Sequence, residues 1–197
     1  MAFKNCLFIF IMLLCFSGNL YPWSETSRGK RNTFYVSPSF FYPIGEYGNF
    51  SDPGYGGTIL YLRGKTWKSG IEMGGYHLAG AEEDEQEERE LKKSDIITAN
   101  IRTGYTFNII PSFSITPAVS AGLAYIKLKY FLHDTSSSDE KEYHKNGTDP
   151  LVSVSISSDW YFRNGLFIGI ETGYGVLLEK EKNFNFVRCG FSTGVRF

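Results

Sequence analysis

The closing segment of the chain, residues 184–197, alternates between apolar and polar side chains. One phase carries Val187, Cys189, Phe191, Thr193, Val195 and Phe197, and the other carries Arg188, Gly190, Ser192, Gly194 and Arg196. A period of two residues predicts a β-strand, because successive side chains of a strand point to opposite faces. A half-buried strand of a soluble sheet has the same pattern, so this segment alone does not fix its surroundings.

Similar period-two segments, separated by turn residues, recur along the chain and predict eight strands. They cover residues 33–42, 56–66, 67–78, 96–107, 112–130, 151–162, 166–178 and 184–197. Each is long enough to cross a bilayer at a tilt, which takes about 9 to 11 residues. The alternation is weakest in 56–66, where Ile59 and Tyr61 are predicted to point inward.

The connections between these segments alternate in length. Tight turns are predicted at 64–66, 108–111 and 163–165, whereas long polar loops are predicted at 44–55, 79–95 and 133–150. An even number of strands, with short turns at one end and long loops at the other, is typical of bacterial outer-membrane barrels. The predicted fold class is therefore all-β, an eight-stranded antiparallel up-and-down transmembrane β-barrel.

The aromatic carboxy-terminus adds a resemblance to a known class of proteins. Phe197 ends the chain, with Phe191 and Val195 in the same phase, and this arrangement resembles the assembly signal of bacterial outer-membrane barrels. Over residues 33–197 the chain resembles the small OmpA/OmpX-like barrels in strand number, loop asymmetry and closing strand. The resemblance is architectural and carries across no catalytic or binding residue.

This resemblance implies a monomeric integral protein of the bacterial outer membrane. The partners it implies are outer-membrane lipid and lipopolysaccharide, the assembly machinery at the C-terminal strand, and a host or cell-surface ligand at the external loops. The roles it implies are envelope integrity, surface adhesion or resistance to host defence.

The amino-terminal segment predicts export from the cytoplasm. Lys4 precedes an apolar run over residues 6–16, and the small residues Ser17 and Gly18 follow, which is the pattern of a cleaved secretory signal peptide. Residues 1–18 are therefore assigned to the signal, 19–32 to a short periplasmic lead and 33–197 to the barrel domain. Lipidation at Cys15 is the alternative, but it is disfavoured because Leu14 stands where a small residue is expected.

Composition narrows the function further. The net charge is −1 and the mean hydropathy is −0.20, with 17% aromatic residues. No basic field is available to attract nucleic acid, so we expect no nucleic-acid partner. Removal of the signal leaves Cys189 as a single cysteine, which excludes an intramolecular disulfide. No cofactor and no metal site is expected.

The polar phase of the strands carries charges of both signs that would face the lumen. These residues are Lys68, Glu72, Arg102, Asp159, Glu171, Arg188 and Arg196. An eight-stranded barrel is narrow enough to be filled by its own side chains, so we interpret them as a network of ion pairs, with a proton or small-ion path as the alternative. A symmetric hairpin would place Glu72 directly across from Arg102, and Glu171 about diagonal to Arg188.

Two further features offer candidate chemistry. Residues 82–90 are acidic except at Gln86 and Arg89, which predicts a solvated external loop. The alternative is a site for divalent cations or for a basic partner, although the spacing is not that of a calcium-binding loop.

His77 with Ser94 and Asp95 is a loose analogue of the His, Asp and Ser of palmitoyltransferase-type barrels. We expect no enzyme; a lipid-A-modifying acyltransferase or deacylase and a secreted lipocalin-like binder remain the alternatives, with His133 and His144 the other histidines considered.

Overall fold

Antiparallel strands contain nearly all of the chain that the computed structural model describes, which is residues 32–45, 52–79, 89–133, 140–162, 164–178 and 183–197. The strands are β1 (Asn32–Ile44), β2 (Gly54–Arg63), β3 (Trp67–Ala79), β4 (Arg89–Tyr105), β5 (Phe107–Ile110), β6 (Phe113–His133), β7 (Glu140–Tyr161), β8 (Leu166–Leu177) and β9 (Phe184–Arg196). The predicted signal peptide, all of the predicted lead except Asn32, and most of the acidic run 82–90 lie outside these residues.

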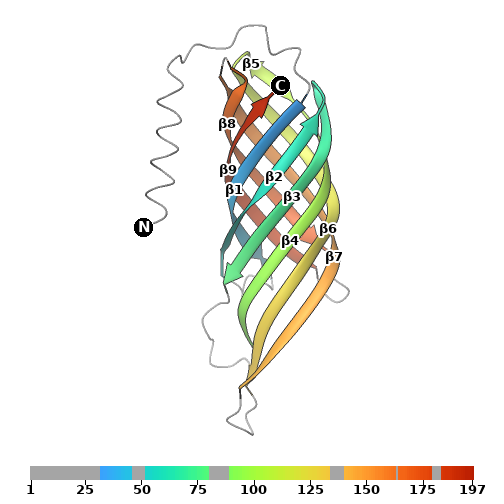
Figure 1. Cartoon of the computed structure of the whole chain (residues 1–197), viewed down its shortest axis with the longest axis vertical. Helices are drawn as coiled ribbons and strands as arrows, with labels where there is room; N and C mark the ends of the chain where they lie inside the picture. Colours follow the sequence, from blue (N-terminus) through green and yellow to red (C-terminus); the bar gives the residue numbers. More distant parts are fainter. Residues whose placement is uncertain (1–31, 46–51, 80–88, 134–139, 163, 179–182) are drawn as a thin grey trace, which may run out of the picture.

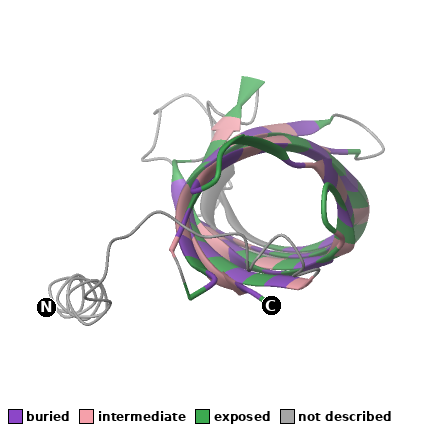
Figure 2. Ribbon diagram, turned by 90° about the horizontal axis from the view of Figure 1, so that it is seen from above, coloured by how far each residue is buried: buried purple, intermediate pink, exposed green. Residues whose placement is uncertain are grey.

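The strands close into a barrel whose wall has eight positions (Figures 1 and 2). Sequential strands pair antiparallel around the wall, and β1 meets β9 to close it. The short strand β5 follows β4 after Thr106, and both pair with β6, so the two share one position. The predicted fold class is confirmed, because strand order, direction and closure are all as the alternation indicated.

The two faces of the wall differ in polarity, and the apolar face points outward. Buried and exposed residues alternate along the strands (Figure 2). Ile71, Ile101 and Phe191 are 60%, 72% and 65% exposed, whereas Glu72 and Arg102 are only 1% and 2% exposed. A soluble protein buries its apolar side chains. Here they are exposed on the outer wall, which is the arrangement of a barrel surrounded by lipid. The described residues contain no helix that is both long and apolar enough to cross a membrane.

Strand β2 corrects one sequence expectation. Ile59 and Tyr61 were expected inside but point outward, and Leu60 and Leu62 occupy the interior instead. The prediction was wrong because bulky residues occupy both phases here, so the local pattern does not define the inner face. Cross-strand pairing decides it: Tyr61 lies opposite Phe34 on β1.

The tight turns lie at the end of the barrel where Asn32 and Phe197 meet (Figure 1). Gly64 and Gly165 have φ values of 136° and 89°, which side chains rarely allow, so glycine is needed at both turns. In the second turn the Gly165 amide donates to the Phe162 carbonyl at 3.1 Å, and the Leu166 amide donates to Asn164 Oδ1, also at 3.1 Å.

At the opposite end, three strands continue beyond the rest of the wall (Figure 1). Pairing of β6 with β7 runs on from Leu123 and Pro150 to His133 and Glu140, and β4 joins the other edge of β6 as far as Arg89. The predicted loops 79–95 and 133–150 were therefore wrong over much of their length. We call the outer parts of these strands, residues 89–95, 126–133 and 140–149, the β4/β6/β7 ribbon.

Candidate functional site

The interior of the barrel is arranged in layers. Near the ribbon end lies an apolar layer made of Phe41, Tyr76, Leu78, Ile96, Ala124, Ile126, Leu151, Leu177, Phe184 and Phe186. Near the turn end lies a second one, made of Tyr35, Leu60, Leu62, Tyr161 and Phe167. Between them lie the buried side chains of Glu72, Arg102, Glu171 and Arg188, so a charged layer is flanked by two apolar ones.

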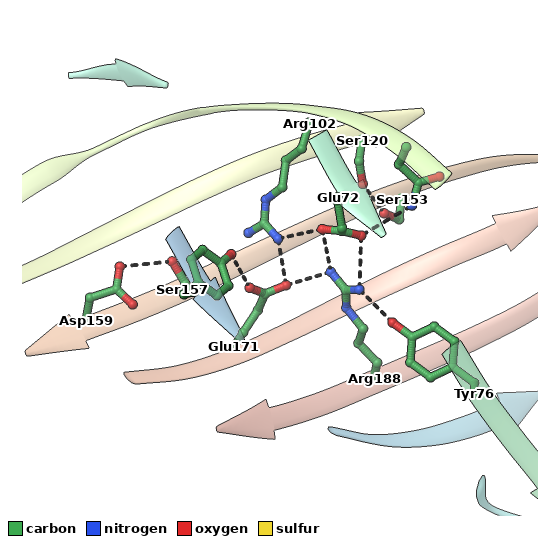
Figure 3. A network of polar contacts seen from close by, with 11 residues as sticks. Glu72, Tyr76, Arg102, Ser120, Ser153, Ser157, Asp159, Glu171 and Arg188 are labelled. Carbon is green, nitrogen blue, oxygen red and sulfur yellow. Dashed lines mark hydrogen bonds and ion pairs between the residues drawn. The ribbon is translucent and has the colours of Figure 1, made fainter. Parts of the chain in front are cut away.

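Four charged residues from four strands form the central network (Figure 3). Glu72 comes from β3, Arg102 from β4, Glu171 from β8 and Arg188 from β9. Arg102 Nη1 donates to Glu72 Oε2 and to Glu171 Oε1, both at 2.8 Å. All four side chains are at most 8% exposed, so water screens these interactions poorly.

Arg188 makes the second connection between the same two carboxylates. Its Nη1 lies 3.1 Å from Glu72 Oε1, and its Nη2 lies 3.3 Å from Glu72 Oε2 and 2.6 Å from Glu171 Oε1. The pairing with Glu72 uses two nitrogens and two oxygens, which fixes the planar groups relative to each other. Each acid is therefore held by both arginines.

Neutral side chains complete the network. Tyr35 donates its hydroxyl to Glu171 Oε2 at 2.9 Å, and the Tyr76 hydroxyl accepts from Arg188 Nη1 at 2.9 Å. Asn100 donates to Glu72 Oε1 at 3.3 Å. Sequence reasoning missed these three residues, although their strand phase placed each of them inside.

The register of the β3–β4 hairpin differs from the symmetric expectation. Glu72 lies opposite Asn100, and Arg102 lies opposite Gly70, so the predicted direct pairing of Glu72 with Arg102 was wrong by two residues. The long arginine side chain still reaches the carboxylate across the diagonal. On β8 and β9, Glu171 faces Gly190 and Arg188 faces Gly173, which is the diagonal placement that we expected.

The other three predicted lumen charges lie apart from this network. Lys68, Asp159 and Arg196 are 2%, 7% and 6% exposed. Asp159 Oδ2 accepts from Ser157 at 3.4 Å, and Arg196 donates to the Lys65 carbonyl at 3.3 Å with its guanidinium 5.3 Å from the centre of the Tyr161 ring. Within the part of the chain that the structure describes, no ion pair shorter than 4.0 Å joins these three residues.

The central network suits holding strands together better than carrying protons. It contains two carboxylates and two guanidinium groups, so its formal charges cancel. Arginine does not give up its proton in proteins, so neither Arg102 nor Arg188 can pass one along a chain. In the described residues no group of three or more His, Cys, Asp or Glu side chains is placed to hold a metal ion.

The histidine candidates do not assemble a triad with Ser94. His77 and Asp95 lie opposite each other on the outer face, and His77 Nδ1 is 2.7 Å from Asp95 Oδ1. Ser94 is the neighbour of Asp95 on β4, so it points to the other face and is 2% exposed. His133 and His144, which were expected in a loop, belong to β6 and β7.

The residues of the predicted assembly signal lie on the outer wall. Phe191 and Phe197 are 65% and 52% exposed, and Val195 is half-buried. Phe197 and Asn32 exchange two backbone hydrogen bonds of 2.9 Å, so the last residue of the chain takes part in closing the barrel.

Comparison with known proteins finds a likeness in structure alone. No protein-family model matches the sequence, and no curated protein matches it. Ail, the attachment invasion locus protein of Yersinia pestis, superposes with a TM-score of 0.55 over 85% of this chain and 99% of Ail, at 10% identity. Neisserial surface protein A superposes with a TM-score of 0.56 over 84% of this chain and 97% of that protein, at 9% identity. The predicted resemblance to small outer-membrane barrels is confirmed as a likeness of fold.

Proposed function

We propose that the chain is an integral protein of the bacterial outer membrane that binds an extended segment of another protein at the β4/β6/β7 ribbon. The outer wall carries apolar side chains all around, which supports the membrane location. The filled lumen supports a structural role for the barrel, as a stable base for the ribbon. Surface adhesion is the role that this arrangement favours.

One observation carries the binding proposal, the unpaired outer edge of β7. Pairing of β7 with β8 begins at Leu151 and Leu177, and the Leu178 amide donates to the Pro150 carbonyl at 2.9 Å. Among the described residues, no strand pairs with this edge over 140–149. At about 3.3 Å per residue, this edge is roughly 30 Å long.

Backbone geometry shows which amide groups of β7 point to the open edge. The amide and carbonyl of one strand residue point to the same side, and successive residues alternate sides. The Pro150 carbonyl points toward β8, so the amides of Thr148, Asn146 and His144 point to the open edge. Such a row of unpaired groups is a template on which an extended peptide can add as a further strand.

A proline scan with matched controls tests the proposal. Asn146→Pro removes one amide from the open edge, whereas Asn146→Ala changes the side chain and keeps that amide. A phage-displayed peptide library would be panned on the folded full-length mature protein in nanodiscs. We expect peptides whose binding is lost with Asn146→Pro and kept with Asn146→Ala; peptides insensitive to Asn146→Pro and Thr148→Pro would contradict strand addition.

We further propose that the protein has no lipid-modifying activity. The support is that Ser94 lies on the opposite face from His77 and Asp95, so these three residues do not form a nucleophilic triad. Mass spectra of lipid A from cells overexpressing the protein should therefore match those from cells without it. A new acylated or deacylated species that disappears with His77→Ala would overturn this view.

A further inference from the structure

A row of outward-facing residues crosses β2, β3, β4 and β6 where the apolar wall ends, and it meets the uncharged Asn146 on β7. Tyr55 on β2 lies opposite His77, His77 opposite Asp95, and Asp95 opposite Lys127 on β6. We call Tyr55, His77, Asp95 and Lys127 the rim row. Its neighbours one step toward the middle of the wall are Gly57, Gly75, Ile97 and Tyr125.

The rim row is ordered by contacts among its members and with Tyr125. His77 Nδ1 and Asp95 Oδ1 are 2.7 Å apart, with side chains 29% and 48% exposed. The Tyr55 and His77 ring centres lie 5.5 Å apart. Lys127 Nζ lies 5.8 Å from the centre of the Tyr125 ring, in a cation–π arrangement. Exposed side chains that hold one another in this way present fixed donors and acceptors.

Among the outward positions that the structure describes at this end, the charges of the rim row lie on one side of the barrel. On β1, β8 and β9 the outward positions near the same end are Tyr42, Ile44, Tyr174, Val176, Leu178, Asn185 and Val187, none of which is charged. A general interfacial belt would surround the barrel evenly. The rim row is therefore a local feature of β2, β3, β4 and β6.

We propose that the rim row binds the headgroup of a phosphorylated glycolipid in the outer leaflet. Lys127 supplies the cation for a phosphate. Asp95 and His77 can accept hydrogen bonds from sugar hydroxyls, and the 65% exposed ring of Tyr55 offers a flat amphipathic surface at headgroup level. Apolar Ile97 and the Tyr125 ring lie directly below, at the level of the first acyl carbons.

This assignment explains the presence of an acid beside the lysine. A site for a phosphate alone would gain nothing from Asp95, because a carboxylate repels the ligand. A phosphorylated sugar carries both an anion and hydroxyl donors, so it can use both charges at once. The chemistry of the row therefore favours a glycolipid over a simple phospholipid or free phosphate.

Titration of the folded full-length mature protein with purified lipid A, followed by native mass spectrometry in detergent, tests the site. We expect Lys127→Gln to weaken lipid A binding about fivefold, the equivalent of the ~1 kcal/mol that one lysine near a membrane contributes to binding anionic lipid. Asp95→Asn and Tyr55→Ala should also weaken binding. Arg63→Gln removes an exposed cation at the other end of β2 and should leave the affinity unchanged.

Specific results would overturn the assignment. Equal losses with Lys127→Gln and Arg63→Gln would show attraction by general charge. Phosphatidylcholine binding as tightly as lipid A, or displacement of lipid A by millimolar inorganic phosphate, would remove the glycolipid assignment. Each variant should keep the compact, unboiled form on electrophoresis, which confirms that the barrel is folded. Asn146 lies opposite Lys127, but the strand-addition test removes a backbone amide of β7 and this test changes side chains of the rim row, so either proposal can fail alone.

Discussion

Arg102 donates from one nitrogen, Nη1, to two carboxylates on opposite parts of the barrel wall. The side chain is 2% exposed, so its charge is stabilised mainly by Glu72 and Glu171. Breaking a buried ion pair by removing one partner leaves an uncompensated charge and costs about 3–5 kcal/mol. The network is therefore sensitive to a change in its balance of charge.

Arg102→Ala should lower the free energy of unfolding by about 3–5 kcal/mol, since Glu72 and Glu171 would then share only Arg188. The double variant Arg102→Ala/Glu171→Gln has one acid facing one base, so it should recover part of the loss. Urea titration in detergent micelles would measure both. Arg63→Ala, at an exposed position, is the control and should change stability by less than about 0.5 kcal/mol. A double variant less stable than the single one would refute charge balance as the cause.

Two glycines offer a matched test of internal packing. A Cβ at Gly175 would overlap the ring of Phe186, which stacks on Phe41 with ring centres 4.3 Å apart. A Cβ at Gly75 would meet no atom within 4 Å. Gly175→Ala should therefore destabilise the barrel by roughly 1–3 kcal/mol through overpacking, and Gly75→Ala should be close to neutral. Thermal unfolding followed by electrophoretic mobility would compare them.

At this scale the sequence predicted which charged side chains face the lumen. It also predicted the two pairs that form within hairpins, Glu72 with Arg102 and Glu171 with Arg188. Phase follows from the period-two pattern, and it placed Glu72 and Arg188 correctly inside. Register depends on how the chain turns between strands, and the pattern does not contain this information. The contacts of Arg188 with Glu72 and of Arg102 with Glu171 cross the barrel, so they follow only from the closed shape.

Among the elements, β9 closes the barrel against β1 and carries residues of the predicted assembly signal. The two backbone bonds between Phe197 and Asn32 do not depend on the phenyl ring, which is 52% exposed on the outer wall. A substitution of the Phe197 side chain therefore tests recognition by the assembly machinery without removing the backbone bonds that close the barrel.

Phe197→Ala should reduce the amount of barrel that reaches the outer membrane of cells, because an assembly factor would lose its aromatic contact. Unassisted folding from urea into detergent should reach the same yield as the wild type, because the backbone bonds remain. Membrane fractionation and the heat-dependent mobility shift would measure the two yields. An equal loss in both would mean that Phe197 acts through stability instead.

The ribbon shows where prediction from sequence ends at the scale of elements. Beyond the membrane both faces of a strand meet water, so no apolar phase is required and the period-two signal fades. Residues 140–150 consequently read as a polar loop, although they form part of β7. Inside the membrane the requirement is strict, and there the predicted strands lie close to the observed ones.

For the whole molecule, we expect the stacked layers to close the lumen to ions. The apolar layer near the ribbon includes Phe41, Phe184 and Phe186, whose rings pack within 4.3–6.3 Å of one another. The charged layer follows, and ions would have to displace both. The wild-type protein should therefore give no large, stable conductance steps in planar bilayers. Arg102→Ala should behave in the same way, because the apolar layer remains; steady channel currents from either protein would contradict a filled lumen.

The distribution of the four central charges has a consequence for how the barrel enters its membrane. Glu72 and Arg102 belong to one hairpin, β3 with β4, and Glu171 and Arg188 to another, β8 with β9. Each hairpin thus brings an acid together with its own counterion before the wall is complete. Neither carries a net charge from these residues while it is being inserted, and closure adds the contacts between two neutral pairs.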